Sequence, residues 1–424
     1  MLQNRILNKI VIVAALGYFV DIYDLLLFGV ERKESLTEIL LAQFPNASLN
    51  QLLNLNTLYG KILLNWQMGG MLIGGLFWGI LGDKKGRLSV LFGSILTYSL
   101  ANIANGFVHT TTMYAACRFI SGFGLAGELG AGITLVSETM SKEKRGIGTM
   151  VVATVGVFGA VVAGFMGEII QNWRHSYFIG GAMGLLLLIL RMGVLESSMF
   201  TSMKLENRKN ENFLSLFTKK ERLVKYLSII FVTVPVWYVM GTLVLFSPEI
   251  FHKLQTLRGI SGNGGEVLAG KSIMYAYIGI TAGDFICGWI SQIWKSRKKT
   301  LRLFLTLSVL AIIAYFIFGG ISVNVFYGVV VVLGFSTGYW TVFISTASEL
   351  FGTNVRSTAT TTAPNFVRGS TILVSYLLSA LGVLFNPSGL LPTLIGGSII
   401  FVLAFLALYH LEETFGKDLN YLEK

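Results

Sequence analysis

The chain has little of the material from which soluble catalytic and metal sites are built. Only 13% of its 424 residues are charged, four are histidine and two are cysteine, whereas a soluble domain averages about 25% charged residues. Cys117 and Cys287 both fall in apolar runs, as packing residues do. We find no metal-ligand cluster, nucleophile elbow or paired-cysteine motif. We therefore expect no catalytic site, cofactor or metal, and no enzyme.

Apolar residues, in contrast, are abundant. They make up 53% of the chain, and the mean hydropathy is +0.67. Apolar runs near 20 residues, the length a helix needs to cross about 30 Å of hydrocarbon, recur along the whole sequence. The first run carries two aspartates and lacks a small-residue cleavage site, which indicates a retained span rather than a signal peptide. The sequence predicts an all-α polytopic membrane protein without a soluble domain.

Twelve transmembrane helices are expected, in two six-helix halves. The first half, 1–195, holds spans at 9–30, 59–81, 88–107, 111–137, 147–171 and 176–195. A polar cytoplasmic linker follows at 196–224. The second half, 225–424, holds spans at 225–251, 271–294, 301–320, 323–348, 358–384 and 391–411, followed by a short cytoplasmic tail.

The formal charge of +11 invites a nucleic-acid interpretation, which the distribution of charge excludes. With both termini placed in the cytoplasm, 23 of the 33 lysines and arginines lie in cytoplasmic segments and 7 in outer segments. This asymmetry is the positive-inside pattern of membrane proteins. It predicts a multi-pass protein of a bacterial inner membrane, whose partners are the lipid bilayer, a small-molecule substrate and a coupling proton. We expect a monomer.

The two halves echo each other in sequence. Ser137-Glu138 is followed by Arg145 seven residues after the glutamate, and Ser348-Glu349 is followed in the same way by Arg356. The offset of 211 residues is close to half the chain. A basic loop, DKKGR, after the second span is matched by KSRKK after the eighth. Two six-helix repeats related by an axis along the membrane normal are a known transporter plan.

These motifs resemble those of the major facilitator superfamily over essentially the full length. The stretch from Gly79 to Arg87 resembles its signature loop, and the stretch from Arg118 to Ala126 resembles its fourth-helix motif. Further matches are Glu138 with Arg145, Trp173-Arg174, Glu349 with Arg356, and the tail 411–416. The first span, DIYDLLLFG from Asp21, is similar to the metabolite:proton symporter and sugar-porter branches, and Gly127-Glu128 favours the former.

Two positions depart from the family pattern. Gln292 stands where the second signature loop usually has aspartate. Ala160 stands where drug/proton exporters typically carry proline, which argues against an exporter. The resemblance implies a cytoplasmic gating network that favours an outward-open state. Its residues here are Gly79, Asp83, Gly86, Arg87, Glu138, Arg145, Glu349 and Arg356.

Ionisable residues inside a membrane are costly, so each is a candidate for function. Asp21 and Asp24 share a face near the middle of the first span. Arg118 lies at about the depth of Asp24, and we predict an Asp24–Arg118 ion pair that a proton or substrate opens. The resemblance implies the same coupling role, and a static pair locking two helices is the alternative. Asp21 and Glu128 are secondary candidates, each of which has a structural role as its alternative.

The second half carries the expected substrate site. Arg368 either pairs with Asp284 or clamps a substrate carboxylate or phosphate through its planar fork. Asn365, one turn earlier, adds a hydrogen bond. Two aromatic pairs offer a wall or a cation–π site, with packing as the alternative: Trp237 and Tyr238, Tyr339 and Trp340.

Other candidates are weaker. The four histidines, His109, His175, His252 and His410, fall outside the span cores, so carboxylates must handle protons. The run from Gly265 to Ser272 fits a phosphate-loop pattern but lacks the strand–loop–helix context that such a loop needs. We predict a proton-coupled symporter of a small anionic or zwitterionic metabolite. The alternatives are a proton-driven exporter of a small organic molecule or siderophore, and a non-transporting sensor or scaffold.

Overall fold

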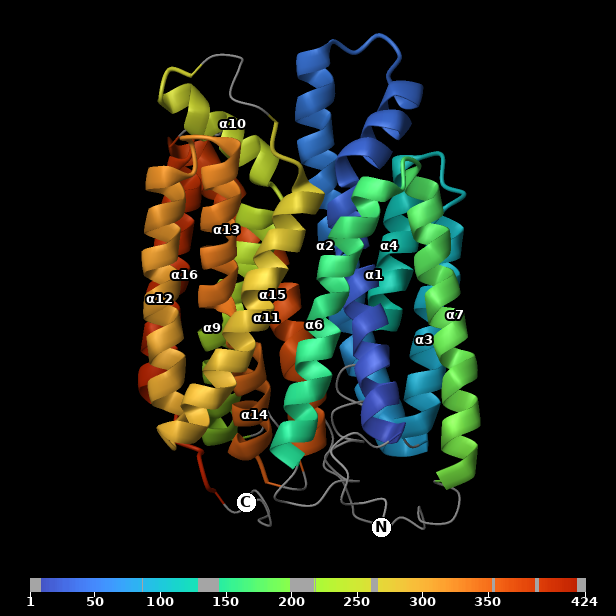
Figure 1. Ribbon diagram of the computed structural model, residues 1–424, viewed down its shortest axis with the longest axis vertical. Helices are drawn as coiled ribbons and strands as arrows, with labels where there is room; N and C mark the ends of the chain where they lie inside the picture. Colours follow the sequence, from blue (N-terminus) through green and yellow to red (C-terminus); the bar gives the residue numbers. More distant parts are fainter. Residues whose placement is uncertain are drawn as a thin grey trace.

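The computed structural model is an all-helical bundle in the residues it describes. These are 9–85, 87–128, 145–198, 217, 219–260, 266–352, 355–385 and 389–417. Within them, nine helical segments are long and apolar enough to cross a membrane by length and composition. Helix α1 begins and α16 ends at the lower end of the bundle in Figure 1. We call this the terminal end, and the opposite end the distal end.

The first half comprises six helices, each of which coincides with a predicted span. They are α1 (Lys9–Gln43), α2 (Leu49–Lys85), α3 (Arg87–Asn105), α4 (Thr111–Leu125), α6 (Arg145–Ile169) and α7 (Trp173–Ser198). The fourth span was predicted to 137, and its last part lies outside the described residues. So does most of the linker at 196–224.

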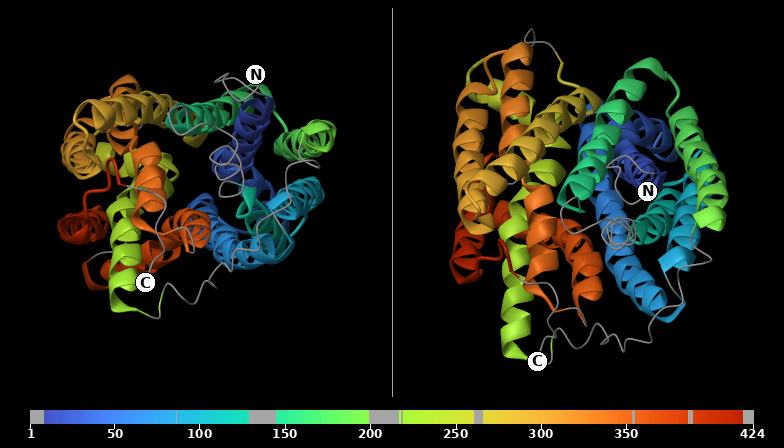
Figure 2. Two further views of the ribbon diagram at one scale, coloured as in Figure 1. Left: turned by 90° about the horizontal axis from the view of Figure 1, so that it is seen from below. Right: turned by 60° about the horizontal axis from the view of Figure 1, so that its bottom comes forward.

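The second half contains the other six spans, two of which are broken. Its elements are α9 (Lys220–Tyr238), the π-helix η2 (Val239–Val244), α10 (Ser247–Leu257), α11 (Ala269–Ile293), α12 (Arg297–Phe318), α13 (Val323–Thr337), α14 (Trp340–Leu350), α15 (Arg356–Phe385) and α16 (Leu391–His410). Figure 2 shows the two halves side by side. The prediction of twelve spans in two six-helix halves is confirmed.

Helices α1 and α2 extend beyond their predicted spans at the distal end. With 35 and 37 residues, they are each more than about 50 Å long at 1.5 Å per residue. The hydrocarbon layer is about 30 Å thick. Leu36, Ile39 and Leu40 continue the helical stripe past residue 30 and are buried. Hydropathy therefore predicted the membrane-spanning part of α1 and α2, but not where each helix ends at the distal end.

Both breaks in the second half have local causes. Pro235 removes a backbone donor inside α9, and the chain then widens into η2. Between α13 and α14, Gly338 approaches α11 so closely that a Cβ there would lie 2.6 Å from the backbone nitrogen of Asp284. Helix α14 starts after this break, and its free N–H groups need acceptors.

The halves meet along two lines of helix contact. Helices α2 and α15 pack together through Gly75 against Asn365 and Gly69 against Ile372. Helices α6 and α11 pack through Gly164, where a Cβ would lie 2.8 Å from the Cβ of Met274. Small residues at such crossings let membrane helices approach closely. Glycines on α2 and α6 therefore set how closely the two halves approach along these lines.

Candidate functional site

Asp24 and Arg118 are both fully buried in the first half, but they do not form the predicted ion pair. Arg118 Nη2 donates instead to Asn102 Oδ1 of α3 at 2.6 Å. With the Asn105 amide turned so that its oxygen faces the guanidinium, Asn105 accepts from Nε at 3.0 Å. Neither oxygen of Asp24 receives a hydrogen bond from a described protein group. The neutral side chains of Asn102 and Asn105, one turn apart on α3, therefore bind Arg118 in place of the predicted partner Asp24.

The guanidinium of Arg118 also stacks on an aromatic ring. Its Cζ lies 4.8 Å from the ring centre of Tyr177 on α7, within the range of a cation–π contact. The hydroxyl of Tyr177 lies 2.6 Å from that of Tyr114, which in turn lies 3.1 Å from Ser35 Oγ. Arg118 is thus held by helices α3 and α7. Asp24 lies beside the same helices, since Asn102 and Arg118 both act on it and a Cβ on Gly180 of α7 would collide with its Oδ1.

Glu128 has a partner that the sequence analysis missed. Arg191 of α7 donates to both of its carboxylate oxygens, with Nη1 to Oε2 at 3.0 Å. Both side chains are buried, and a Cβ on Gly17 of α1 would collide with the pair. The charge count contained the signal for this partner. Of the 33 lysines and arginines, 23 were assigned to cytoplasmic segments and 7 to outer segments, which leaves three inside the spans. Of these three, only Arg191 had no assigned role.

Asp21 lies between the two halves. It is 1% exposed, and its Oδ1 has no hydrogen-bond partner among the described residues. The charges that act on it electrostatically are Glu128, Asp24 and Arg191 from its own half and Arg368 from the other. Arg368 also acts on Tyr18, one turn before Asp21 on α1. The structure thereby links α1 to α15 and adds Tyr18 to the residues around the site.

Arg368 is buried at this interface without a carboxylate partner among the described residues. It is 1% exposed, its Nε has no hydrogen-bond acceptor, and its Cζ lies 5.6 Å from the ring centre of Trp340. The proposed alternative, an Arg368–Asp284 pair, is not formed. Asp284 Oδ1 instead accepts from the backbone nitrogen of Thr341 at 3.0 Å and so caps α14 after the break at Gly338.

The remaining substrate candidates divide into interface and packing residues. Asn365 donates to the carbonyl oxygens of Ala126 in the first half and Thr361, at 2.9 and 3.0 Å. Its donors therefore hold α15 against α4. Tyr238 donates to Thr393 O at 2.7 Å and Tyr339 to Val232 O at 3.1 Å, both within the second half. Trp237 is buried in α9. Only Trp340 contacts Arg368.

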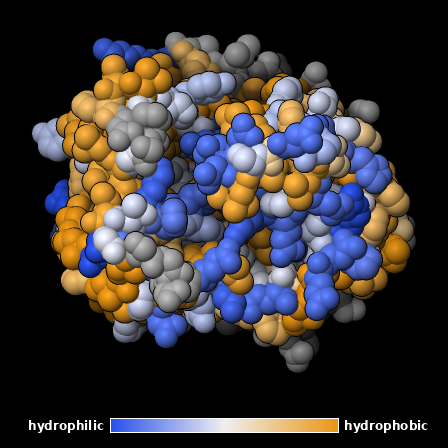
Figure 3. All heavy atoms as spheres, turned by 90° about the horizontal axis from the view of Figure 1, so that it is seen from above, coloured by the Kyte–Doolittle hydropathy of each residue, from blue (hydrophilic) through white to orange (hydrophobic). Residues whose placement is uncertain are grey.

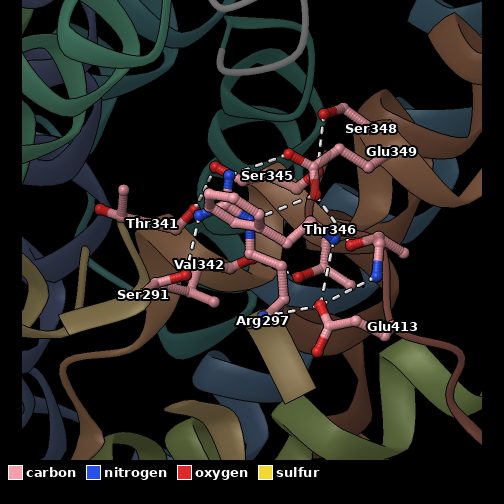
Figure 4. A network of polar contacts seen from close by, with 11 residues as sticks. Ser291, Arg297, Thr341, Val342, Ser345, Thr346, Ser348, Glu349 and Glu413 are labelled. Atoms are coloured by element: carbon pink, nitrogen blue, oxygen red, sulfur yellow. Dashed lines mark hydrogen bonds and ion pairs between the residues drawn. The ribbon is translucent and has the colours of Figure 1, made fainter. Parts of the chain in front are cut away.

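At the terminal end, Glu349 of the gating motif forms an ion pair with Arg297. Arg297 donates to the two Glu349 oxygens at 3.2 and 2.9 Å and to Ser291 Oγ at 2.8 Å. Arg356 donates to Phe351 O at 3.1 Å. The chain tail joins this network, since Thr414 Oγ1 donates to Glu349 at 2.8 Å. Figure 4 shows Glu349, Arg297 and the tail residue Glu413 close together. Arg297 had been counted only as a charge that sets orientation.

Glu413 of the tail caps the first turn of α12. It accepts from Ser296 Oγ and from the backbone nitrogens of Arg297 and Lys298. Burial raises the pKa of this carboxyl, but these hydrogen bonds and one from the Phe415 backbone outweigh the burial, so that the pKa lies below its ordinary value.

The first-half gating motif is largely outside what the structure describes. Gly79 lies on α2, where a Cβ would meet Thr362 of α15 at 4.0 Å. The side chains of Asp83, Arg87 and Arg145, and the whole of Gly86 and Glu138, lie outside the described residues. In the second half, Lys295 occupies the place of Gly86, seven residues after Gly288, and takes a positive φ of 48°.

Two helical halves that enclose buried charges at their interface define a polytopic membrane transporter. The chain matches the description "Major Facilitator Superfamily" over residues 36–375. It therefore belongs to the major facilitator superfamily, and it is a membrane transporter of small metabolites.

Individual relatives agree with this assignment. A putative metabolite transport protein of Haemophilus influenzae is 26% identical over 72% of each chain. A putative niacin/nicotinamide transporter of Bacillus subtilis is 25% identical over 70% of this chain and 73% of its own. The solved structure of the proton:xylose symporter XylE matches 97% of each chain with a TM-score of 0.69 and 16% identity, which shows a common fold.

Proposed function

We propose that the protein is a proton-coupled symporter of a small anionic or zwitterionic metabolite. It works by alternating access, in which the two halves rock about the central charges. The excess of lysine and arginine in the predicted cytoplasmic segments supports an orientation with the terminal end in the cytoplasm of a bacterial cell and the distal end outside the inner membrane. The family's usual state, a monomer, suffices for this mechanism.

The observation that carries the proposal is the isolation of Arg368. An ionised side chain buried without a partner is strongly disfavoured, and Arg368 has no ion-pair partner among the described residues. Its planar fork matches the geometry of a carboxylate. A substrate carboxylate at Arg368, against the face of Trp340, supplies the missing charge. The nearby Asp21 adds a place for the ammonium group of a zwitterion.

The niacin relative supports this substrate class, because niacin is a carboxylic acid. The name of this relative also includes nicotinamide, which has the same ring without the charge. Nicotinate and nicotinamide therefore form a matched pair of probes within a wider panel of carboxylates and their neutral amides.

The test is ligand-induced thermal stabilisation of the purified protein with that panel. A ligand that binds the folded state raises apparent stability by mass action, about 2.7 kcal/mol at a hundredfold excess over Kd. We expect stabilisation by one or more carboxylates and none by the matching amides. Arg368→Gln should abolish it, whereas Lys33→Gln, a change on the surface, should not. Stabilisation by the same ligands in Arg368→Gln would refute the assignment.

Proton coupling is assigned to Asp24, and Asp21 and Glu128 are secondary. Asp24 is buried with no hydrogen bond to either oxygen, and Arg118 acts on it electrostatically. An ionised carboxylate is costly there unless a conformational change solvates it. Protonation is thus tied to conformation without a direct ion pair. Asp24→Asn should abolish gradient-driven accumulation yet preserve counterflow exchange in proteoliposomes. Accumulation at the wild-type level would exclude Asp24.

A further inference from the structure

An ion pair between a buried arginine and a glutamate that is 27% exposed joins the two halves at the distal end. Arg32 of α1 is 1% exposed, and its Nη2 donates to Glu249 Oε1 of α10 at 2.7 Å. The Arg32 Cζ lies 4.5 Å from the ring centre of Phe246. Its Nη1 lies 3.4 Å from Asn56 Oδ1, and its Nε has no partner. One helix of each half therefore contributes one charge to this contact.

Positive charge exceeds negative charge around this pair. Lys61 of α2 interacts electrostatically with Glu249 and Arg32, and Lys253 of α10 interacts with Glu249 and Lys61. Three cations thus share one carboxylate in the described part of this contact. If Glu249 moved away, three positive charges would face whatever entered between the halves. Figure 3 shows that polar residues gather over this end of the molecule.

Apolar residues seal the contact one helical turn deeper. Gly29 lies three residues before Arg32 on the same face of α1. A Cβ on Gly29 would lie 2.9 Å from Ile273 Cδ1 of α11 and would collide with the side chain of Leu245. Separation of Arg32 from Glu249 must expose this layer before anything can reach Arg368.

We propose that Arg32 and Glu249 form an outer gate that, when open, is an anion-selective entrance built by Arg32, Lys61 and Lys253. The choice of an anion rests on the proposed function, but the gate itself does not. Removal of one partner of a buried ion pair leaves an uncompensated charge and strongly favours the state in which that charge is solvated. Here, that state is the one with the distal end open.

A neighbouring ion pair provides the matched control. Lys33 of α1 contacts Glu266, which precedes α11, so that this pair also joins the halves. Its side chains are 44% and 67% exposed, and exposed pairs contribute little. Lys33→Gln should therefore leave the gate closed.

The experiment uses the purified full-length protein with Cys117→Ala and the reporter Ile273→Cys. Leu245→Cys serves as a second reporter. Buried Cys287 remains as an internal control. Glu249→Gln, which leaves the buried Arg32 without a carboxylate, should raise the reporter's reaction rate with methanethiosulfonates at least about tenfold. Arg32→Gln should raise it less, because Lys61 and Lys253 remain beside the partly exposed Glu249. The exchange Arg32→Glu with Glu249→Arg should restore slow labelling. A reactive Cys287 would indicate a loosened variant, in which case the exchange variant decides.

Reagent charge tests the entrance. In Glu249→Gln, the reporter cysteine should react faster with the anionic sulfonatoethyl methanethiosulfonate than with the cationic trimethylammonium reagent. With each rate divided by that reagent's rate with a free thiol, we expect a ratio of at least about five. Adding Lys61→Gln and Lys253→Gln should reduce that preference. If neither Arg32→Gln nor Glu249→Gln changed the labelling rate, the proposal of an outer gate would be wrong. If the two reagents reacted at equal corrected rates, the proposal of an anion-selective entrance would be wrong. Neither readout needs a substrate, so failure of Arg368 as a binding residue would leave these results standing.

Discussion

At the scale of single residues, the buried charges were predictable but their partners were not. Asp24, Arg118 and Arg368 stand out because ionisable residues in spans are rare. Their contacts depend on helix rotation and on neighbouring helices that one sequence does not place. Asn102 and Asn105, which hold Arg118, are neutral and carry no comparable signal. Charge alone therefore located the buried ionisable residues but gave the wrong partner for Arg118.

The Glu128–Arg191 pair leads to a stability prediction. Arg191→Leu leaves Glu128 buried without its partner, which should cost about 3–5 kcal/mol, whereas replacing both charges by apolar residues is often neutral or stabilising. Thermal unfolding of the purified Arg191→Leu and Glu128→Leu/Arg191→Leu proteins measures this. Equal losses in the two proteins would show that the charges do not act as a pair.

At the scale of elements, hydropathy located all twelve spans but neither of the two breaks. A hydropathy window averages over a π-turn such as η2 or a two-residue interruption such as Gly338-Tyr339. Pro235 was the available signal for the first break. The second depends on contact with α11, which a window along one segment does not contain.

Helix α13 offers a matched pair of glycines for testing close packing. A Cβ on Gly334 would collide with the backbone of Ala276, whereas one on Gly328 would meet nothing within 4 Å. Gly334→Ala should destabilise the protein by about 1–3 kcal/mol through overpacking. Gly328→Ala should stabilise it by up to about 1 kcal/mol. Unfolding temperatures of the two variants measure the contrast, and a common direction of change would contradict it.

The cap on α12 should depend on pH. Because the folded-state pKa of Glu413 is lowered, its contribution is present above the unfolded-state pKa and is lost as the pH falls through the folded-state value. Loss of a cap costs about 0.5–2 kcal/mol, and partial exposure places this one at the lower end. Glu413→Gln should flatten the pH dependence of unfolding below about pH 5. An unchanged profile would exclude this role.

At the scale of the whole molecule, the internal repeat and the charge count predicted most of the architecture. The 211-residue echo divided the chain into halves, and the structure shows them side by side. Which helices form the interface could not be read from the sequence, because α2–α15 and α6–α11 contacts run between segments far apart in the chain.

Sidedness is the prediction at this scale. In a background with Cys117→Ala and Cys287→Ala, an impermeant maleimide applied to intact cells should label Lys33→Cys but not Lys299→Cys. Disruption of the cells should make both reactive. Lys33 lies at the distal end and is partly exposed, whereas Lys299 lies at the terminal end and is exposed. Labelling of Lys299→Cys but not Lys33→Cys in intact cells would therefore reverse the proposed orientation.

The π-helix η2 lies between the rigid part of α9 and the residues of the distal contact, Phe246 and Glu249. A π-turn holds one residue more than an α-turn. Its conversion to α geometry would rotate the following segment by about 100° and move it by about 1.5 Å. Such a register change would move Glu249 relative to Arg32 without a movement of α9. The π-helix thus lies where a change of one residue in helical register would turn the outermost segment of the second half by itself.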